Sequence, residues 1–130
     1  MSTDTVEQRA DALRQTIVAL VRRDGPDLSA RQFGVFLTSY LEEEAQTVRG
    51  LAAKLNVSKP AITRALDRLS EFDLARRKTD PLDRRSVLVQ RTMAGVGFLR
   101  DLKKILGEAD KEAQRAPSKV RRASTLVSVA

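Results

Sequence analysis

The residues best suited to chemistry are cationic and polar side chains gathered in two short segments. The first segment, residues 58–69, contains Ser58, Lys59, Thr63, Arg64 and Arg68. Arg64 can make a bidentate contact with a guanine edge, and Thr63 can hydrogen-bond a base or touch a thymine methyl group. Free N–H groups at Lys59 and Ala61, at the start of a helix, favour a backbone phosphate. This is chemistry that reads base pairs in the major groove of DNA.

The second segment, residues 79–86, is a charged turn that contains Arg84 and Arg85 and follows Lys78. An arginine at the tip of a hairpin can enter a narrow minor groove, where the negative potential is strongest. Asp83 precedes the two arginines, although a carboxylate repels phosphate. We interpret Asp83 as an orienting residue, because a carboxylate can hold a guanidinium in one rotamer.

Apolar spacing predicts the helices that would position the first segment. Apolar residues recur at i, i+3, i+4 and i+7 in residues 47–55 and again in residues 58–69, which is the pattern of amphipathic helices. Thr47 and Ser58 are candidate N-caps, and Pro60 falls in a first turn, where its missing N–H is harmless. Only two residues separate the helices, so the pair predicts a helix-turn-helix.

Residues 74–78 and 86–90 predict two short strands on either side of the charged turn. The connection between them is longer than a two-residue turn. A helix-turn-helix followed by a basic hairpin is a winged helix. The expected fold class is therefore mainly α with a small β-hairpin wing.

Three further helices are predicted by their apolar stripes, over residues 4–23, 30–45 and 93–115. Ser29 caps the second of them and Thr92 caps the third. The second ends in three consecutive glutamates, which oppose the macrodipole at a helix C-terminus. We therefore expect that end to fray or to be capped from elsewhere in the chain. The segment Gly95-Val96-Gly97 indicates helix packing, because it lacks the context of a dinucleotide site.

The outer helices leave more apolar surface than one small lobe can cover, which predicts a two-fold homodimer. The candidate dimerisation residues are Leu13, Ile17, Leu99, Leu102 and Leu106. We expect a single winged-helix domain over residues 1–116, with its DNA-binding lobe at 28–91. Residues 117–130 show no amphipathic period and predict a basic, flexible tail.

Composition excludes several function classes. The 130 residues include no Cys and no His, so disulfides, thiolate nucleophiles and the commonest metal ligands and general base are absent. We expect no enzyme, no metal and no cofactor. No stretch approaches the ~20 apolar residues of a membrane span, and from the polar N-terminal residues we expect no secretory leader. A cytoplasmic protein without membrane contact is expected.

The net charge of +7 is unevenly distributed along the chain. Residues 1–46 carry 5 basic and 8 acidic side chains, residues 47–91 carry 11 and 5, and residues 92–130 carry 8 and 4. The basic excess therefore begins at the predicted helix-turn-helix and continues to the C-terminus. A basic segment of this kind indicates contact with nucleic acid.

These segments also resemble a known family. Residues 28–33 and 51–69, followed by the wing 80–89 with its Asp-x-Arg and alternating apolar strand, are similar to the multiple antibiotic resistance regulator (MarR) family. The resemblance extends over roughly residues 28–110. One departure is Arg91, where the family commonly has Leu before the threonine that begins the last long helix.

The resemblance implies a homodimeric bacterial transcription regulator, usually a repressor, that binds double-stranded DNA through its recognition helix and wing. The N- and C-terminal helices would form the dimerisation region. Arg85 would be the minor-groove residue and Asp83 its orienting partner. The major-groove face would carry Ser58, Lys59, Pro60, Thr63 and Arg64.

The lack of Cys and His excludes the thiol oxidant sensors of that family and disfavours its metal sensors. A small-molecule effector stays open, with no residue to identify it. Two other functions also stay open. One is an architectural, nucleoid-type protein of low sequence discrimination, and the other is a winged-helix module that contacts a protein. The operator, the target genes, the sign of regulation and the role of the tail do not follow from the sequence.

Overall fold

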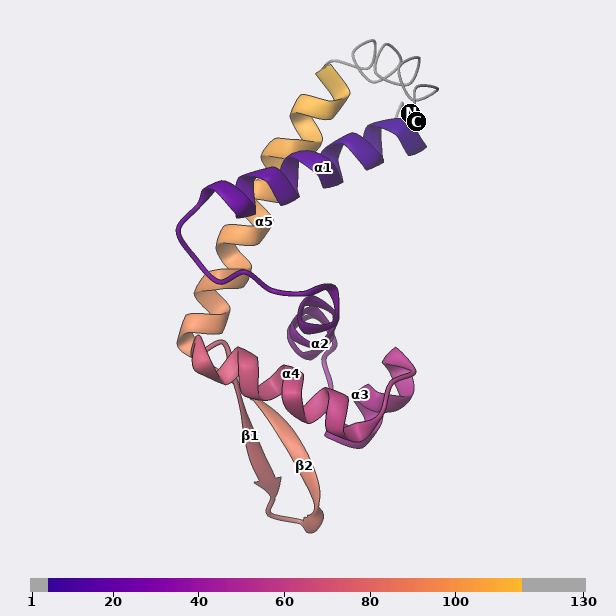
Figure 1. The fold of residues 1–130 in the computed structure, drawn as a ribbon, viewed down its shortest axis with the longest axis vertical. Helices are drawn as coiled ribbons and strands as arrows, with labels where there is room; N and C mark the ends of the chain where they lie inside the picture. The colour runs from indigo at the N-terminus through magenta and orange to yellow at the C-terminus, as the bar shows by residue number, and fades with distance from the viewer. Residues whose placement is uncertain (1–4, 116–130) are drawn as a thin grey trace. The chain divides into compact units, whose positions relative to one another are not determined.

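A computed structural model describes residues 5–115, and the predicted tail at 117–130 lies outside the described residues. The chain divides into two compact units. One unit spans Leu28–Arg100, and the other joins the N-terminal stretch through Asp27 to the C-terminal stretch from Asp101. Five helices and a two-stranded antiparallel hairpin make up the described part of the chain (Figure 1), as the fold class predicted.

The three helices of the Leu28–Arg100 unit begin at the predicted caps. They are α2 (Ala30–Leu41), α3 (Val48–Leu55) and α4 (Lys59–Glu71). The side chains of Ser29, Thr47 and Ser58 each accept a hydrogen bond from the backbone N–H three residues later. These caps satisfy N–H groups that have no partner inside the helix.

The turn between α3 and α4 is tight because Asn56 adopts a left-handed conformation, with φ 55° and ψ 49°. Asparagine tolerates this region better than most residues with a side chain. The backbone N–H of Val57 then donates to the carbonyl oxygen of Ala52 at 3.0 Å, which closes the end of α3. The helix-turn-helix predicted from sequence is confirmed.

The hairpin is longer than its apolar pattern predicted. Strand β1 spans Ala75–Asp80 and β2 spans Asp83–Arg91, and Asp80 pairs with Asp83. The strands are therefore joined by two residues only, and the predicted long loop is wrong. Charged residues that the sequence placed in the loop extend the strands, because an exposed hairpin needs no apolar face near its tip.

The core of this unit surrounds Phe36 of α2, which is fully buried. The Phe36 ring lies 4.5 Å from the Tyr40 ring and 5.3 Å from the Phe98 ring, measured between centroids. The other fully buried large side chains are Val35, Leu51, Ile62, Leu66 and Leu69. Residues from α2, α3 and α4 thus share one core, which fixes the orientation of α4.

Helix α2 ends at Leu41, four residues before the predicted end, so the glutamates lie outside it. Its C-terminal carbonyls are capped by Arg91, whose Nε donates to the Ser39 oxygen at 2.9 Å and whose Nη2 donates to the Glu42 oxygen at 2.7 Å. The expectation of a cap from elsewhere is confirmed. The arginine that departs from the family pattern supplies that cap.

Helix α5 spans Met93–Arg115, as predicted, and residues through Arg100 belong to the winged-helix unit. The Thr92 Oγ1 accepts the N–H of Gly95 at 2.9 Å and donates to the Asp73 oxygen at 2.6 Å. A Cβ atom on Gly95 would collide with the Tyr40 hydroxyl and the backbone of Leu74. The interpretation of this glycine as a packing residue is confirmed.

The second unit consists of α1 (Val6–Arg22) and the part of α5 from Asp101. Its buried apolar cluster contains three alanines, Ala12, Ala109 and Ala113. An ion pair joins Arg23 to Asp101 at 3.4 Å. Among the described residues, no helix is both long and apolar enough to span a membrane.

Candidate nucleic-acid interface

Helix α4 buries one face and presents the other to solvent. Its buried face consists of Ala61, Ile62, Ala65, Leu66 and Leu69. Lys59 and Arg64 are exposed and Thr63 is half-buried. The predicted recognition residues Ser58 and Pro60 are also exposed, so all five predicted major-groove residues of α4 are at least partly accessible to solvent.

The N-terminus of α4 is less open than the sequence suggested. Ala61 is buried, with 5% of its surface exposed. Its N–H donates to the Ser58 Oγ at 3.2 Å. The prediction of a free N–H at Ala61 is therefore wrong, because the Ser58 cap already satisfies it. Pro60 has no N–H, so a phosphate here depends on Lys59.

Ion pairs divide the cations of the winged-helix unit into two groups. Arg68 pairs with Glu71 at 2.6 Å and stacks on the Phe72 ring, 4.6 Å from its centroid. Two more arginines are paired, Arg77 with Asp67 and Arg76 with Asp73. Arg68 is thus held toward the C-terminal end of α4, and its guanidinium is already neutralised.

The second group has no carboxylate partner in the part of the chain that the structure describes. It includes Arg31, Arg49, Lys59, Arg64, Lys78, Arg84 and Arg85. Most of the predicted DNA-binding cations belong to this group. Unpaired cations on an exposed surface attract a polyanion.

The wing tip is shaped by two aspartates that accept backbone hydrogen bonds. Asp80 accepts from the Leu82 N–H at 2.9 Å, and Asp83 accepts from the Arg85 N–H at 3.1 Å. Asp83 therefore holds the backbone of Arg85, and no bond from its carboxylate to the guanidinium is seen among the described residues. The tip residues from Pro81 through Arg85 are all exposed.

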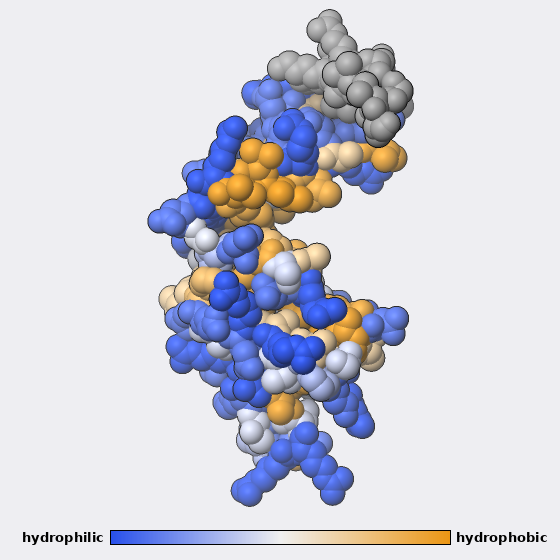
Figure 2. All heavy atoms as spheres, in the orientation of Figure 1, coloured by the Kyte–Doolittle hydropathy of each residue, from blue (hydrophilic) through white to orange (hydrophobic). Residues whose placement is uncertain are grey.

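The pairing of the hairpin shifts between Thr79 and Asp80. Thr79 pairs with Val87 while Asp80 pairs with Asp83, which leaves Arg84, Arg85 and Ser86 outside the regular ladder. Such an irregularity bends a strand and redirects its side chains. Both wing arginines lie in this stretch, at the end of a hairpin that projects from the helices of its unit (Figures 1 and 2).

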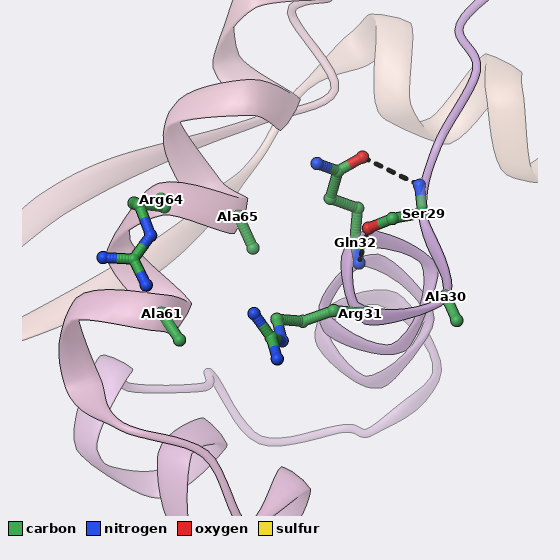
Figure 3. Close-up of a pocket in the computed structure, with 7 residues that line it drawn as sticks. All are labelled: Ser29, Ala30, Arg31, Gln32, Ala61, Arg64 and Ala65. Atoms are coloured by element: carbon green, nitrogen blue, oxygen red, sulfur yellow. Dashed lines mark hydrogen bonds between the residues drawn. The ribbon is translucent and has the colours of Figure 1, made fainter.

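A groove between α2 and α4 contains a residue that the sequence analysis missed. Figure 3 shows Arg31 extending from α2 toward α4, where Arg64 lies on the facing helix. No local pattern distinguishes Arg31, since a lone arginine in the first turn of a helix is ordinarily solvated. Only the packing of α2 against α4 brings Arg31 and Arg64 into the lining of one groove.

The predicted dimerisation residues fall into two classes. Leu13, Ile17 and Leu106 are exposed to 58%, 50% and 42% in the single chain. Leu102 is buried at 4%, and Leu99 packs against the core of the winged-helix unit. Leu99 and Leu102 therefore already serve the fold of one chain. Figure 2 shows apolar side chains gathered on the surface of the α1–α5 unit.

No group of three or more acidic, His or Cys side chains with metal-binding geometry occurs among residues 5–115. The groove between α2 and α4 and the exposed surfaces of α4 and the wing carry cationic side chains, which favour binding of an anion.

Comparison with known proteins agrees with this architecture. Residues 28–87 match the model of the MarR family. Wild-type MarR from E. coli, solved in its apo form, is 26% identical with a TM-score of 0.62, and the match covers 95% of this chain and 89% of that one. MepR from S. aureus, solved in a complex with DNA, is 18% identical with a TM-score of 0.64, and the match covers 92% of each chain. No curated protein sequence matches the chain significantly.

Proposed function

Since the chain is a MarR-family transcription regulator with a DNA-binding winged helix, we propose that it is a homodimeric, sequence-specific repressor. The observation that carries the proposal is that the cations at the start of α4 and at the wing tip have no carboxylate partner among the described residues. Three neighbouring arginines, Arg68, Arg76 and Arg77, are each paired with a carboxylate. The DNA complex of S. aureus MepR, which has the same fold, supports it. We propose no catalytic activity for the protein and a location in the cytoplasm.

We assign base reading to α4 and groove-width reading to the wing. Arg64 and Thr63 contact base edges in the major groove, while Ser58, Lys59 and Pro60 lie against the flanking backbone. Arg85 enters the minor groove, with Arg84 and Lys78 contributing charge near phosphates. Asp83 orients Arg85 through its backbone N–H, with which it makes a 3.1 Å hydrogen bond.

A two-fold dimer joined through the α1–α5 units would present two winged helices. Such a dimer reads an inverted repeat whose half-site centres lie about 10 base pairs apart, one helical turn. Leu13, Ile17 and Leu106 are the exposed apolar residues that would be covered. A small-molecule effector is compatible with this scheme, and its identity is left open.

The experiment that tests the proposal compares three variants on a duplex selected from a random library by the wild-type protein, and on derivatives of it with single base-pair changes or altered A·T content beneath the wing. Arg64→Ala should cost about 1–3 kcal/mol per half-site and relax the preference at one or two base pairs. Arg85→Ala should weaken binding in proportion to the A·T content beneath the wing. Asp83→Ala should give a milder form of the Arg85→Ala loss, because the backbone of Arg85 is released.

Simple electrostatics predicts the opposite for Asp83→Ala, because the change removes a negative charge near phosphate. Tighter binding of Asp83→Ala at both low and high salt would therefore contradict an orienting role. Equal affinity of the wild-type protein for selected and random duplexes would instead indicate an architectural protein.

A further inference from the structure

The groove between α2 and α4 is not used by the contacts assigned so far. It has a volume of about 440 Å³. It is lined by Ser29, Ala30, Arg31, Gln32, Ala61, Arg64 and Ala65 (Figure 3). Ala61 and Ala65 are buried, at 5% and 3% exposed, so their small side chains form a shallow floor. The lining residues include two arginines and no acidic residue.

The charge in the groove is uncompensated. Arg31 and Arg64 are exposed and have no acidic partner among the described residues. Two like charges at one groove repel each other. An anion in the groove would gain charge-assisted hydrogen bonds from Arg31, whose side chain extends toward α4 (Figure 3).

Part of the backbone at the start of α2 is already occupied by its own cap. The Gln32 N–H donates to the Ser29 Oγ at 3.1 Å, and the Ser29 N–H donates to the Gln32 Oε1 at 2.9 Å. This capping box occupies the N–H groups of Ser29 and Gln32, and the Phe33 N–H donates to the Ser29 carbonyl oxygen. The charge available to an anion in the groove comes from side chains, chiefly from Arg31, which extends toward α4 (Figure 3).

We propose that the groove seats one phosphate of the DNA backbone at the edge of the major groove and that Arg31 is the residue that holds it. This inference rests on the proposed function. Arg31 comes from α2, which flanks the recognition helix, so it is placed to contact backbone beside the bases that Arg64 reads. A planar guanidinium binds phosphate in a bidentate manner. Such a contact fixes the register of the protein on the duplex.

The test measures affinity for the selected duplex from about 50 to 200 mM salt. Arg31→Ala should lower affinity about tenfold per half-site and reduce the salt slope by about one per protomer, with base preferences unchanged. Arg31→Lys should recover part of the loss, since it keeps the charge but not the fork.

The matched control is Arg76→Ala. It removes the same charge from the same unit, but the guanidinium of Arg76 is held by Asp73 through bonds of 3.1 and 2.7 Å. This variant should bind DNA nearly as the wild type does. If Arg31→Ala and Arg76→Ala lose equal affinity, Arg31 acts only through net charge and the inference is overturned.

A second measurement locates the phosphate. Duplexes with a neutral methylphosphonate at one position should bind the wild-type protein more weakly when that position faces Arg31. The same duplexes should show no such effect with Arg31→Ala. An effect that persists in the variant at every position would overturn the assignment. If the wild-type protein does not prefer any selected duplex, the proposed function fails, whatever Arg31 does.

Discussion

The two units of this chain bury their apolar side chains to very different degrees. The Leu28–Arg100 unit encloses aromatic and aliphatic residues around Phe36, and six large side chains in it are fully buried. The α1–α5 unit has a buried cluster of three alanines, while Val6, Leu13, Ile17, Val21 and Leu106 are at least 42% exposed. The winged-helix unit also exposes Leu41, Leu82, Met93 and Val96, but it encloses a core of large side chains. The α1–α5 unit encloses only the alanine cluster and leaves its large apolar side chains largely exposed in the single chain.

This difference indicates two kinds of contribution to the free energy of folding. Burying a leucine side chain contributes roughly 1.5–3 kcal/mol, and in the winged-helix unit this is gained within one chain. In the α1–α5 unit the proposed dimer would supply the same gain through a second copy. Rigid presentation of α4 and the wing therefore depends on the first unit, and in the proposed dimer their duplication depends on the second.

The largest expected effect comes from charging the exposed surface of the α1–α5 unit. Leu13→Asp combined with Leu106→Asp should weaken dimerisation by about a hundredfold or more, because leucines that would be buried between copies become charged. Sedimentation at micromolar concentration should then show a species of single-chain mass. Affinity for an inverted repeat should fall with it, since only a dimer engages both half-sites.

The control for this variant is Leu41→Asp in the winged-helix unit, since Leu41 is 59% exposed and Leu13 is 58% exposed. It should leave the dimer intact. If both changes dissociate the dimer equally, the comparison between the units is wrong. Leu102→Asp is a poorer test, because Leu102 is buried within one chain and its change would also unfold the protomer.

Local signals were sufficient to predict most of the helices. Four helix caps are hydrogen bonds between residues three positions apart, so the local sequence is enough to predict them. The capping residues are Ser29, Thr47, Ser58 and Thr92. The winged helix followed from these caps, the apolar spacing and the position of the basic hairpin.

Features that depend on distant pairing could not be predicted in the same way. The tip of the hairpin depends on the register of β1 against β2, which places Asp80 opposite Asp83. Arg91 caps α2 across 49 to 52 residues of sequence. The meeting of Arg31 and Arg64 at one groove likewise needs two helices to pack.

The next prediction uses a glycine in the winged-helix unit. Gly95→Ala should destabilise the protein by about 1–3 kcal/mol, because the new methyl group would collide with buried neighbours. One of these is the Tyr40 hydroxyl, which donates to the Leu74 oxygen at 2.6 Å and accepts the Thr92 N–H at 2.9 Å. Urea unfolding at a fixed protein concentration measures the loss.

A double-mutant cycle identifies the cause. In a Tyr40→Phe background the cost of Gly95→Ala should fall, since one of the colliding atoms is gone. A cost that stays the same in both backgrounds would place the strain elsewhere.

The smallest expected effect comes from Gly107, which lies in the same helix but in the α1–α5 unit. A Cβ atom there would meet nothing within 4 Å. Gly107→Ala should therefore stabilise one chain by about 0.5–1 kcal/mol, the usual gain in a helix interior. Gly107 is exposed beside Leu106, so the outcome also depends on how closely a second copy approaches. If dimer dissociation and unfolding are measured separately, a gain in unfolding free energy with unchanged dimer affinity places Gly107 outside the interface. The same gain with weaker dimerisation places Gly107 at a close contact between copies.

The contradicting outcome is a loss of stability on Gly107→Ala in a monomeric Leu13→Asp, Leu106→Asp background. Such a loss would show that the space around Gly107 is not open in the single chain.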